Sequence, residues 1–340
     1  MSSLHVLWGF LRNRWSAPSL DYLTPRSIAG RTVLVTGAST GLGLEAARHY
    51  ARLGATRIIL GVRPLRKGET AKQNIEDSLQ PSTSSKHEDA KGTTIEVWEL
   101  DLASFASVYT FVERVLKELD SLDIAVLNAA VSKTCFSFTD DGWEETLQVN
   151  TLSNILRAQL ILPKLRASRR KSDTGDEWIP KLEFLASQLN WLAALNKPET
   201  FDGTSQRYGI SKLFLIYCVR EIATSLSIDE GGRPEVVVNY SCPGACKSEL
   251  AREWHTSWVK SFVLWVLQAT ICKTTEEGSR TLVYATCLEE EGHGKWIHND
   301  AIEAPGKLVE SDLALKWQKR VWDEVGQVLQ GTRPTSQYNR

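Results

Sequence analysis

The chain of 340 residues is 42% hydrophobic and 24% charged, with a formal net charge of −1. This composition is that of an ordinary globular protein, and the balanced charge gives no reason to expect nucleic acid as a partner. Six cysteines without a CxxC pair or a His-bearing metal spacing favour reduced thiols in a cytoplasmic protein and no metal site.

Residues 1–30 are a predicted N-terminal extension. Its spaced apolar positions fit a short amphipathic helix, and they lack the long apolar run of a secretory signal. Packing against the body of the protein is the simpler interpretation, and peripheral membrane contact is the alternative. A second apolar stretch, 258–272, is interrupted by Lys260 and Gln268 and is too short to span a bilayer. We expect it to form part of a substrate lid at about 248–275.

Strands and helices alternate through the next two hundred residues. Runs rich in β-branched residues predict strands at 31–37, 57–63, 94–100, 122–130, 181–187 and 235–245. Apolar residues at helical spacing predict helices at 42–55, 67–80, 104–119, 140–166, 207–226 and 311–329. Such alternation is typical of an α/β, Rossmann-like, doubly wound parallel sheet with helices on both faces. We therefore expect a single catalytic domain over 31–300, followed by a C-terminal helix and tail over 301–340.

A glycine-rich segment, TGASTGLG at 36–43, joins the first predicted strand to the first predicted helix. In this context, backbone N–H groups and the positive end of the helix can hold a dinucleotide pyrophosphate. Glycine allows the backbone to approach the phosphates because it has no Cβ. A tight turn without a ligand is the alternative. The segment predicts a cofactor site that contains Gly37, Ser39, Thr40, Gly41, Leu42 and Gly43.

The spacing Gly-x-x-x-Gly-x-Gly resembles that of the short-chain dehydrogenase/reductase family, and further motifs of that family follow in order up to about residue 250. LDL supplies Asp101 and Leu102 where the family contacts adenine, and LNAAV supplies Asn128 but departs at Leu127 and Ala130 from the family's Asn-Asn-Ala-Gly turn. The remaining matches are Asn150 in QVNTLS, Ser187 in FLASQLN, Tyr208 and Lys212 in YGISK, and Pro243, Gly244 and Ser248 in CPGACKS. The overall sequence is similar to that of fungal members related to retinol dehydrogenases. Many members of that branch are reductases of specialised metabolism.

The resemblance implies a role for each of these residues. Tyr208 would be the general acid or base, and Lys212, one helical turn away, would lower its pKa and reach the nicotinamide ribose. Ser187 would orient the substrate oxygen, and Asn150 would hold a helix distortion and a water that relays protons to Lys212. Pro243 and Gly244 would shape the nicotinamide side of the site, and Ser248 would bind the carboxamide. The plainer alternative for each polar residue is a place on a helix surface or, for Asn150, a helix cap.

The end of the second predicted strand bears on the choice of cofactor. NAD enzymes place an acidic residue there, whereas this chain has Arg63, followed by Arg66 and Lys67. A guanidinium group suits a 2′-phosphate, so NADP(H) is predicted. Thr40 stands where some NADP-dependent members have a basic residue.

The predicted function is an NADP(H)-dependent oxidoreductase that reduces a ketone or aldehyde or oxidises the matching alcohol. Trp191, Trp254 and Trp258 fall in segments that wall the substrate pocket in the family, which favours a bulky apolar substrate. Core packing of these tryptophans is the alternative. A non-redox isomerase or cyclase on the same fold, or a nucleotide-sensing protein, stays open as another function. The resemblance suggests a homo-oligomer, and a monomer is equally open.

Overall fold

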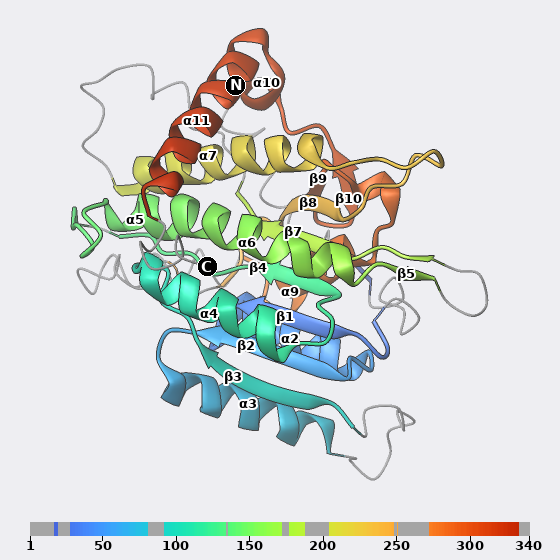
Figure 1. Ribbon diagram of the computed structural model, residues 1–340. Helices are drawn as coiled ribbons and strands as arrows, with labels where there is room; N and C mark the ends of the chain where they lie inside the picture. The colour runs from blue at the N-terminus through green and yellow to red at the C-terminus, as the bar shows by residue number, and fades with distance from the viewer. Residues whose placement is uncertain are drawn as a thin grey trace.

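The computed structural model describes residues 17–19, 28–80, 92–133, 135–171, 177–187, 204–247, 250 and 272–332 (Figure 1). The sheet strands are β1 (Thr32–Thr36), β2 (Arg57–Val62), β3 (Thr94–Glu99), β4 (Ile124–Leu127), β7 (Lys181–Leu185), β8 (Val237–Cys242), β9 (Trp296–His298) and β10 (Ala301–Glu303). The helices are α2 (Gly41–Arg52), α3 (Leu65–Leu79), α4 (Phe105–Glu118), α5 (Glu145–Leu147), α6 (Ser153–Ala167), α7 (Thr204–Ser225), α9 (Thr275–Cys287), α10 (Lys307–Glu310) and α11 (Asp312–Gln330), with a π-helical turn η4 (Gln148–Leu152) and a 3₁₀ turn η8 (Glu290–Gly292).

The eight strands form one sheet in the order β10-β9-β8-β7-β4-β1-β2-β3. The strands from β9 to β3 pair in parallel, and β10 at the edge pairs antiparallel with β9. Strands β1, β4 and β8 are almost fully buried, as expected for a parallel sheet covered on both faces. The predicted Rossmann-like class and single domain are confirmed.

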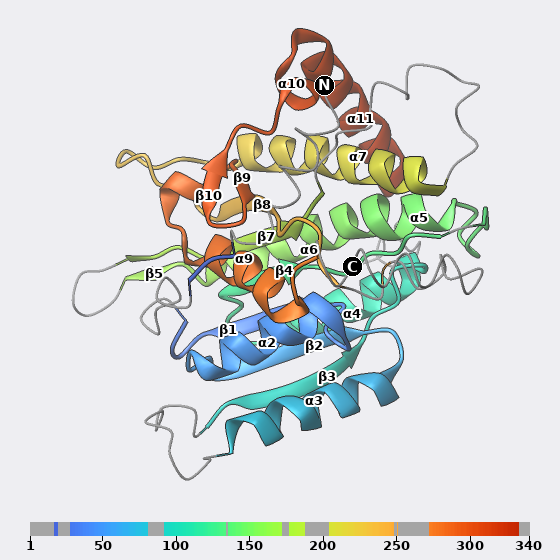
Figure 2. The ribbon, with the colours of Figure 1, turned by 180° about the vertical axis from the view of Figure 1, so that it is seen from behind.

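Helices cover both faces of the sheet. One core joins the sheet to α4, α6 and α7, and the other joins it to α2, α3 and α9. Figure 2 shows α2 beside α9, which pack against each other behind β1 and β2 in the view of Figure 1. This arrangement leaves the carboxyl ends of the parallel strands and the loops that follow them free to form a ligand site.

The C-terminal helix α11 packs against α7 and crosses it at an angle (Figure 1). Its buried face carries Val321, Val325 and Leu329 into the same core as α7. Gln318 adds polar contacts to that packing because its side chain accepts a hydrogen bond from Arg220 and donates one to Glu221. The C-terminal segment therefore belongs to the same folded body as the sheet.

Several elements differ from the sequence prediction. The helix predicted over 140–166 is broken into α5, η4 and α6, so it begins at Glu145 and carries a π-helical turn at Asn150. The edge strands β9 and β10, helix α9 and the small hairpin β5 (Arg170–Lys171) with β6 (Glu177–Trp178) were not predicted. Strands of two or three residues carry no detectable alternation, and the boundary predicted at residue 300 falls inside the β9–β10 hairpin.

Two further findings concern the chain as a whole. All six cysteines are reduced. Within the described ranges, none of the helices has the length and apolar character needed to cross a bilayer. The predicted N-terminal helix lies outside the described residues, as does most of the predicted lid.

Candidate functional site

The glycine loop between β1 and α2 is shaped by close backbone packing. A Cβ at Gly43 would lie 2.5 Å from the carbonyl oxygen of Gly37, and a Cβ at Gly37 would lie 2.9 Å from Cα of Ala129. Gly41 has φ +64° and no heavy atom within 4 Å of where its Cβ would be. The loop is therefore packed tightly on its inner side and open at Gly41, which leaves room for a phosphate against the backbone.

Asn128 fixes this loop from the end of β4. Its side-chain nitrogen donates to the carbonyl oxygens of Thr36 (2.8 Å) and Gly37 (3.3 Å). Asn128 is buried, so these bonds are protected from competing water. Leu127 and Ala130 differ from the family's sequence motif, but the hydrogen bonds between β4 and the glycine loop are still formed.

A cavity of about 290 Å³ opens beside the glycine loop, at the carboxyl ends of β1, β2, β3, β4 and β7. It is lined by most of the residues predicted to bind the cofactor, namely Gly37, Ser39, Thr40, Gly41, Leu42, Arg63, Asp101, Leu102, Asn128 and Tyr208. Gly43 lies behind the loop, and Lys212, Pro243 and Gly244 lie outside the lining. Ser248 is outside the described residues, as are Trp191, Trp254 and Trp258.

The lining also contains residues that were not predicted to bind the cofactor, namely Gly61, Val62, Pro64, Leu100, Ala129, Ala130, Val131, Ser132, Val149, Leu185 and Leu250. Val62 and Leu185 end a strand, and Leu100 follows one directly. The run from Ala129 to Ser132 lies within five residues of the end of β4, so a place near the carboxyl end of a strand is the signal that could have identified these residues. Lys67, which was noted only as a neighbour of Arg63, lines the cavity as well.

Two cations stand at the β2 end of the cavity. Arg63 and Lys67 line it and are exposed, whereas Arg66 is exposed but is not part of the lining. Within the described part of the chain, neither Arg63 nor Lys67 forms an ion pair. At the end of β3, the carboxylate of Asp101 accepts a hydrogen bond from the backbone N–H of Ala103 at 2.9 Å. The cavity thus fits a dinucleotide, with open glycine backbone for phosphates at one end and free positive charge at the other.

Helix α7 brings Tyr208 and Lys212 together with Ser187, which follows β7. The hydroxyl groups of Ser187 and Tyr208 are hydrogen-bonded. The Nζ atom of Lys212 lies 5.9 Å from the centroid of the Tyr208 ring and donates to the carbonyl oxygen of Leu185 at 2.7 Å. Ser187 and Lys212 are 25 residues apart in the sequence, with Tyr208 between them, and the three side chains meet at the carboxyl end of β7.

Asn150 sits in the π-helical turn η4, so the predicted helix distortion is present. Its side-chain oxygen accepts from the N–H of Val131 at 2.9 Å, and its nitrogen donates to the carbonyl of Val131 and to the hydroxyl of Ser211. Its backbone carbonyl accepts from Asn154 at 3.2 Å. Asn150 thus joins the loop after β4 to α7 next to Lys212, and the water relay to Lys212 stays a prediction.

Burial dominates the electrostatics of this cluster. It raises the pKa of Tyr208 above its usual range, with a further rise from Cys242, and the hydrogen bond with Ser187 acts in the opposite direction. The predicted lowering of this pKa is therefore wrong for the protein alone, because the cost of an unsolvated phenolate outweighs the favourable contacts. Burial also lowers the pKa of Lys212 to about 8, against the opposing effects of Glu183 and Cys242.

The Pro243–Gly244 turn follows β8, and Gly244 has φ +76°. The buried ammonium of Lys273 donates to the carbonyl of Pro243 at 3.0 Å and also contacts Asn299. The N–H of Lys273 donates to the carbonyl of Ala245, which fixes the start of α9 against this turn. The turn is thus held rigidly at the end of the strand next to β7.

Fold and site together define a Rossmann-type enzyme with a nucleotide cavity beside a Ser, Tyr and Lys cluster. The family profile described as short chain dehydrogenase matches residues 31–174. The chain is 37% identical to the short-chain dehydrogenase/reductase phmF of Phaeosphaeria nodorum over 89% of this chain and 87% of that one. It is 34% identical to the short chain dehydrogenase/reductase dmxR8 of a Cryptosporiopsis species over 93% of this chain and 95% of that one.

The solved structures agree with the fold. A protein from Mycobacterium paratuberculosis, described as uncharacterized, superposes with a TM-score of 0.61 at 23% identity, over 90% of this chain and 97% of that one. A 3-oxoacyl (acyl-carrier-protein) reductase from Agrobacterium tumefaciens with NADP bound superposes with a TM-score of 0.58 at 20% identity, over 84% of this chain and 97% of that one. The chain belongs to the short-chain dehydrogenase/reductase family, whose members are oxidoreductases that use a nicotinamide cofactor, and the predicted resemblance to its fungal members is confirmed.

Proposed function

We propose that the protein is an NADP(H)-dependent oxidoreductase that reduces a ketone or aldehyde on a bulky, apolar small molecule, and that can run the reverse oxidation. The observation that carries the proposal is the meeting of Ser187, Tyr208 and Lys212 beside the nucleotide cavity, with Lys212 buried one helical turn from Tyr208. The relatives found in fungi support a place in specialised metabolism. We further expect a cytoplasmic protein, with peripheral membrane contact and self-association still to be measured.

Tyr208 acts as the proton donor in the reduction. Because burial raises its pKa, its hydroxyl is protonated at neutral pH and is ready to give a proton to the developing alkoxide. Ser187, which is already hydrogen-bonded to Tyr208, directs a second hydroxyl donor at the same substrate oxygen. When bound, NADPH supplies the hydride that the carbonyl carbon receives.

Lys212 and Asn150 support this step from the protein side. The ammonium of Lys212 lies 5.9 Å from the centroid of the Tyr208 ring and offsets the negative charge that remains on Tyr208 after proton transfer. Its bond to the Leu185 carbonyl holds it in place. Asn150 is a positioning residue, because it fixes the loop of Val131 and the hydroxyl of Ser211 on α7.

The cofactor preference rests on Arg63 and Lys67. Both are unpaired cations within the described part of the chain, and both line the end of the cavity next to β2. A guanidinium binds a phosphate with two charge-assisted hydrogen bonds, which a ribose 2′-hydroxyl cannot match. Short chain dehydrogenases of similar fold from Shigella flexneri and Escherichia coli have been solved with NADP and NADPH, which agrees with this choice.

A turnover assay tests the proposal. We expect NADPH absorbance to fall when the protein is given a panel of bulky ketones, and Tyr208→Phe to lower kcat by at least about 100-fold while leaving NADPH affinity unchanged. Ser187→Ala should lower kcat less, since the tyrosine proton is still present. NADPH binding without turnover of any ketone would shift the assignment to an isomerase or a nucleotide sensor, and full activity of Tyr208→Phe would refute the mechanism.

A further inference from the structure

A cation and two aromatic rings meet beside the proposed proton donor. The guanidinium carbon of Arg207, the residue before Tyr208, lies 4.6 Å from the centroid of the Phe136 ring. Phe136 packs edge-to-face on Phe138, with the ring centroids 4.8 Å apart and the planes at 88°. Both phenylalanines are exposed, at 53% and 68%. Two adjacent, ordered aromatic rings on a surface are a typical feature of a ligand-binding site.

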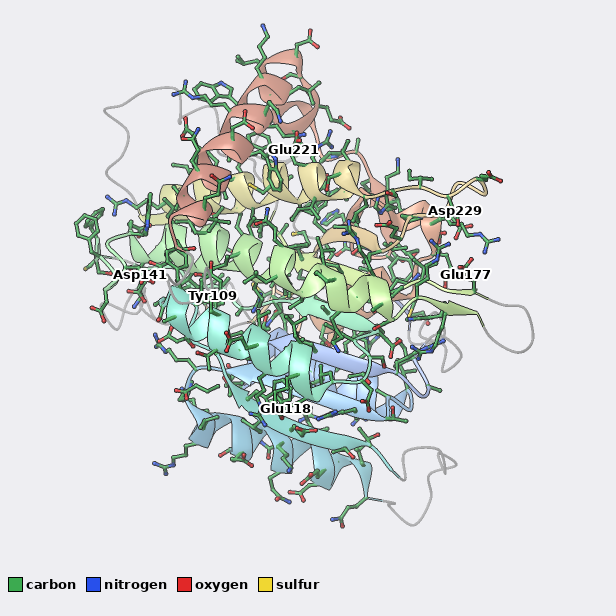
Figure 3. All side chains as sticks on the ribbon, viewed as in Figure 1. Tyr109, Glu118, Asp141, Glu177, Glu221 and Asp229 are labelled. Carbon is green, nitrogen blue, oxygen red and sulfur yellow. The ribbon has the colours of Figure 1, made fainter. Side chains whose placement is uncertain are left out.

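Arg207 has no carboxylate partner among the residues that the structure describes. The neighbouring loop is rich in acids, and Figure 3 marks one of them, Asp141, at the end of the molecule where α5 begins. Three of these acids are engaged elsewhere: Asp141 with the N–H of Phe105, Glu144 with the N–H groups of Thr146 and Leu147, and Glu145 with Lys133 and Ser137. Among the described residues, the stacked guanidinium therefore keeps its in-plane N–H groups free for an anion.

The loop that carries the two phenylalanines begins in the nucleotide cavity. Ala130, Val131 and Ser132 line that cavity, and Phe136 follows four residues after Ser132. Asn150 binds both backbone polar groups of Val131 and the hydroxyl of Ser211, which lies one helical turn after Arg207. The Asn150 contacts thus hold the start of this loop against the stretch of α7 that carries Arg207 and Tyr208.

We propose that Arg207, Phe136 and Phe138 form a substrate subsite for the carboxylate of an aromatic carbonyl compound. The guanidinium binds the carboxylate through two parallel N–H donors, and the phenylalanine rings contact the aromatic part of the substrate. In this proposal the substrate extends from Arg207 at the surface to Tyr208, the next residue of α7, where its carbonyl accepts the proton. This subsite rests on the proposed function, because it selects the substrate that Tyr208 would protonate.

Binding measurements separate the subsite from catalysis. The full chain, saturated with NADP⁺, is titrated with 6-acetyl-2-naphthoate and with its methyl ester by calorimetry at pH 7. The carboxylate should bind at least about 10-fold more tightly than the ester, since a charge-assisted bond is lost in the ester. Arg207→Gln should weaken the acid by about 10- to 100-fold and the ester by less than about 3-fold. Because no turnover is needed, the result stands even if Tyr208 proves not to transfer a proton.

Three variants serve as controls. Arg207→Lys keeps the charge but loses the planar stack and the paired donors, so it should restore only part of the acid's affinity. Phe136→Leu should weaken the acid and the ester alike. Arg320→Gln removes a similar cation, 5.3 Å from the Trp317 ring on α11, and should change neither affinity. Equal binding of acid and ester to the unmodified protein, or equal losses in Arg207→Gln with NADP⁺ affinity intact, would overturn the subsite.

Discussion

The ammonium of Lys212 donates a hydrogen bond to the carbonyl oxygen of Leu185 over 2.7 Å, so that helix α7 is joined to the carboxyl end of β7. Lys212 is 1% exposed, and the groups that act on its charge are Glu183 on β7 and Cys242 on β8. Ser241 donates a hydrogen bond to Glu183, whose second carboxylate oxygen has no partner within the described residues. Burial raises the pKa of Glu183 to about 8. The Glu183 carboxyl group and the Lys212 ammonium group beneath the site therefore titrate in the same pH range.

The pH dependence of activity should reflect this pair. The pKa of Lys212 is lowered to about 8, so its cation is present below that pH and is lost above it. The pKa of Tyr208 is raised, so the phenol stays protonated through the same range. We therefore expect kcat/KM for ketone reduction to be level near pH 7 and to fall as pH rises through about 8, measured with saturating NADPH.

Two variants decide which residue produces this fall. Lys212→Arg, whose guanidinium does not titrate, should be less active but should show no fall near pH 8. Glu183→Gln removes the negative charge that raises the pKa of Lys212. The fall in kcat/KM should therefore remain in this variant and should occur at lower pH. If the fall disappears in Glu183→Gln, the glutamate and not the lysine controls the alkaline side of the profile.

The parts of the site that could be predicted are those with local causes. The glycine loop lies between one strand and one helix, and Tyr208 and Lys212 share one face of one helix. Tertiary packing set the remaining features. The resemblance predicted a helix distortion at Asn150, but the bonds of Asn150 to Val131 and Ser211 join residues that are distant in sequence. The direction of the Tyr208 pKa shift depends on burial by surrounding elements, which a five-residue motif does not contain.

The close packing of Gly43 makes a specific prediction. An alanine Cβ there would lie 2.5 Å from the Gly37 carbonyl oxygen and 2.6 Å from Nδ2 of Asn128, the atom that holds the loop to β4. Gly43→Ala should therefore destabilise the protein by about 1–3 kcal/mol and weaken NADPH binding by at least about 10-fold. Thermal unfolding and a fluorescence titration would measure both effects.

Gly326 provides the matched control. It lies in α11, and no heavy atom lies within 4 Å of where its Cβ would be. Gly326→Ala should leave NADPH binding unchanged and should stabilise the protein by about 0.5–1 kcal/mol, because alanine favours the helix over the unfolded chain. Normal NADPH affinity in Gly43→Ala would show that the loop can move aside and that its packing does not set the phosphate site.

Arg63 and Arg66 allow a test of cofactor choice within one short segment, because only the first of these two arginines lines the cavity. Arg63→Asp replaces a phosphate-binding cation with a carboxylate that repels the 2′-phosphate and can accept a hydrogen bond from a ribose hydroxyl. We expect NADPH affinity to fall by at least about 10- to 100-fold and NADH affinity to change by less than about 3-fold.

Arg66→Asp makes the same change of charge outside the cavity, so it should weaken NADPH binding only slightly, and less at high salt. Equal losses for the two cofactors in Arg63→Asp, or equal losses in the two variants, would mean that the 2′-phosphate is recognised through the general positive charge of the segment and not through Arg63.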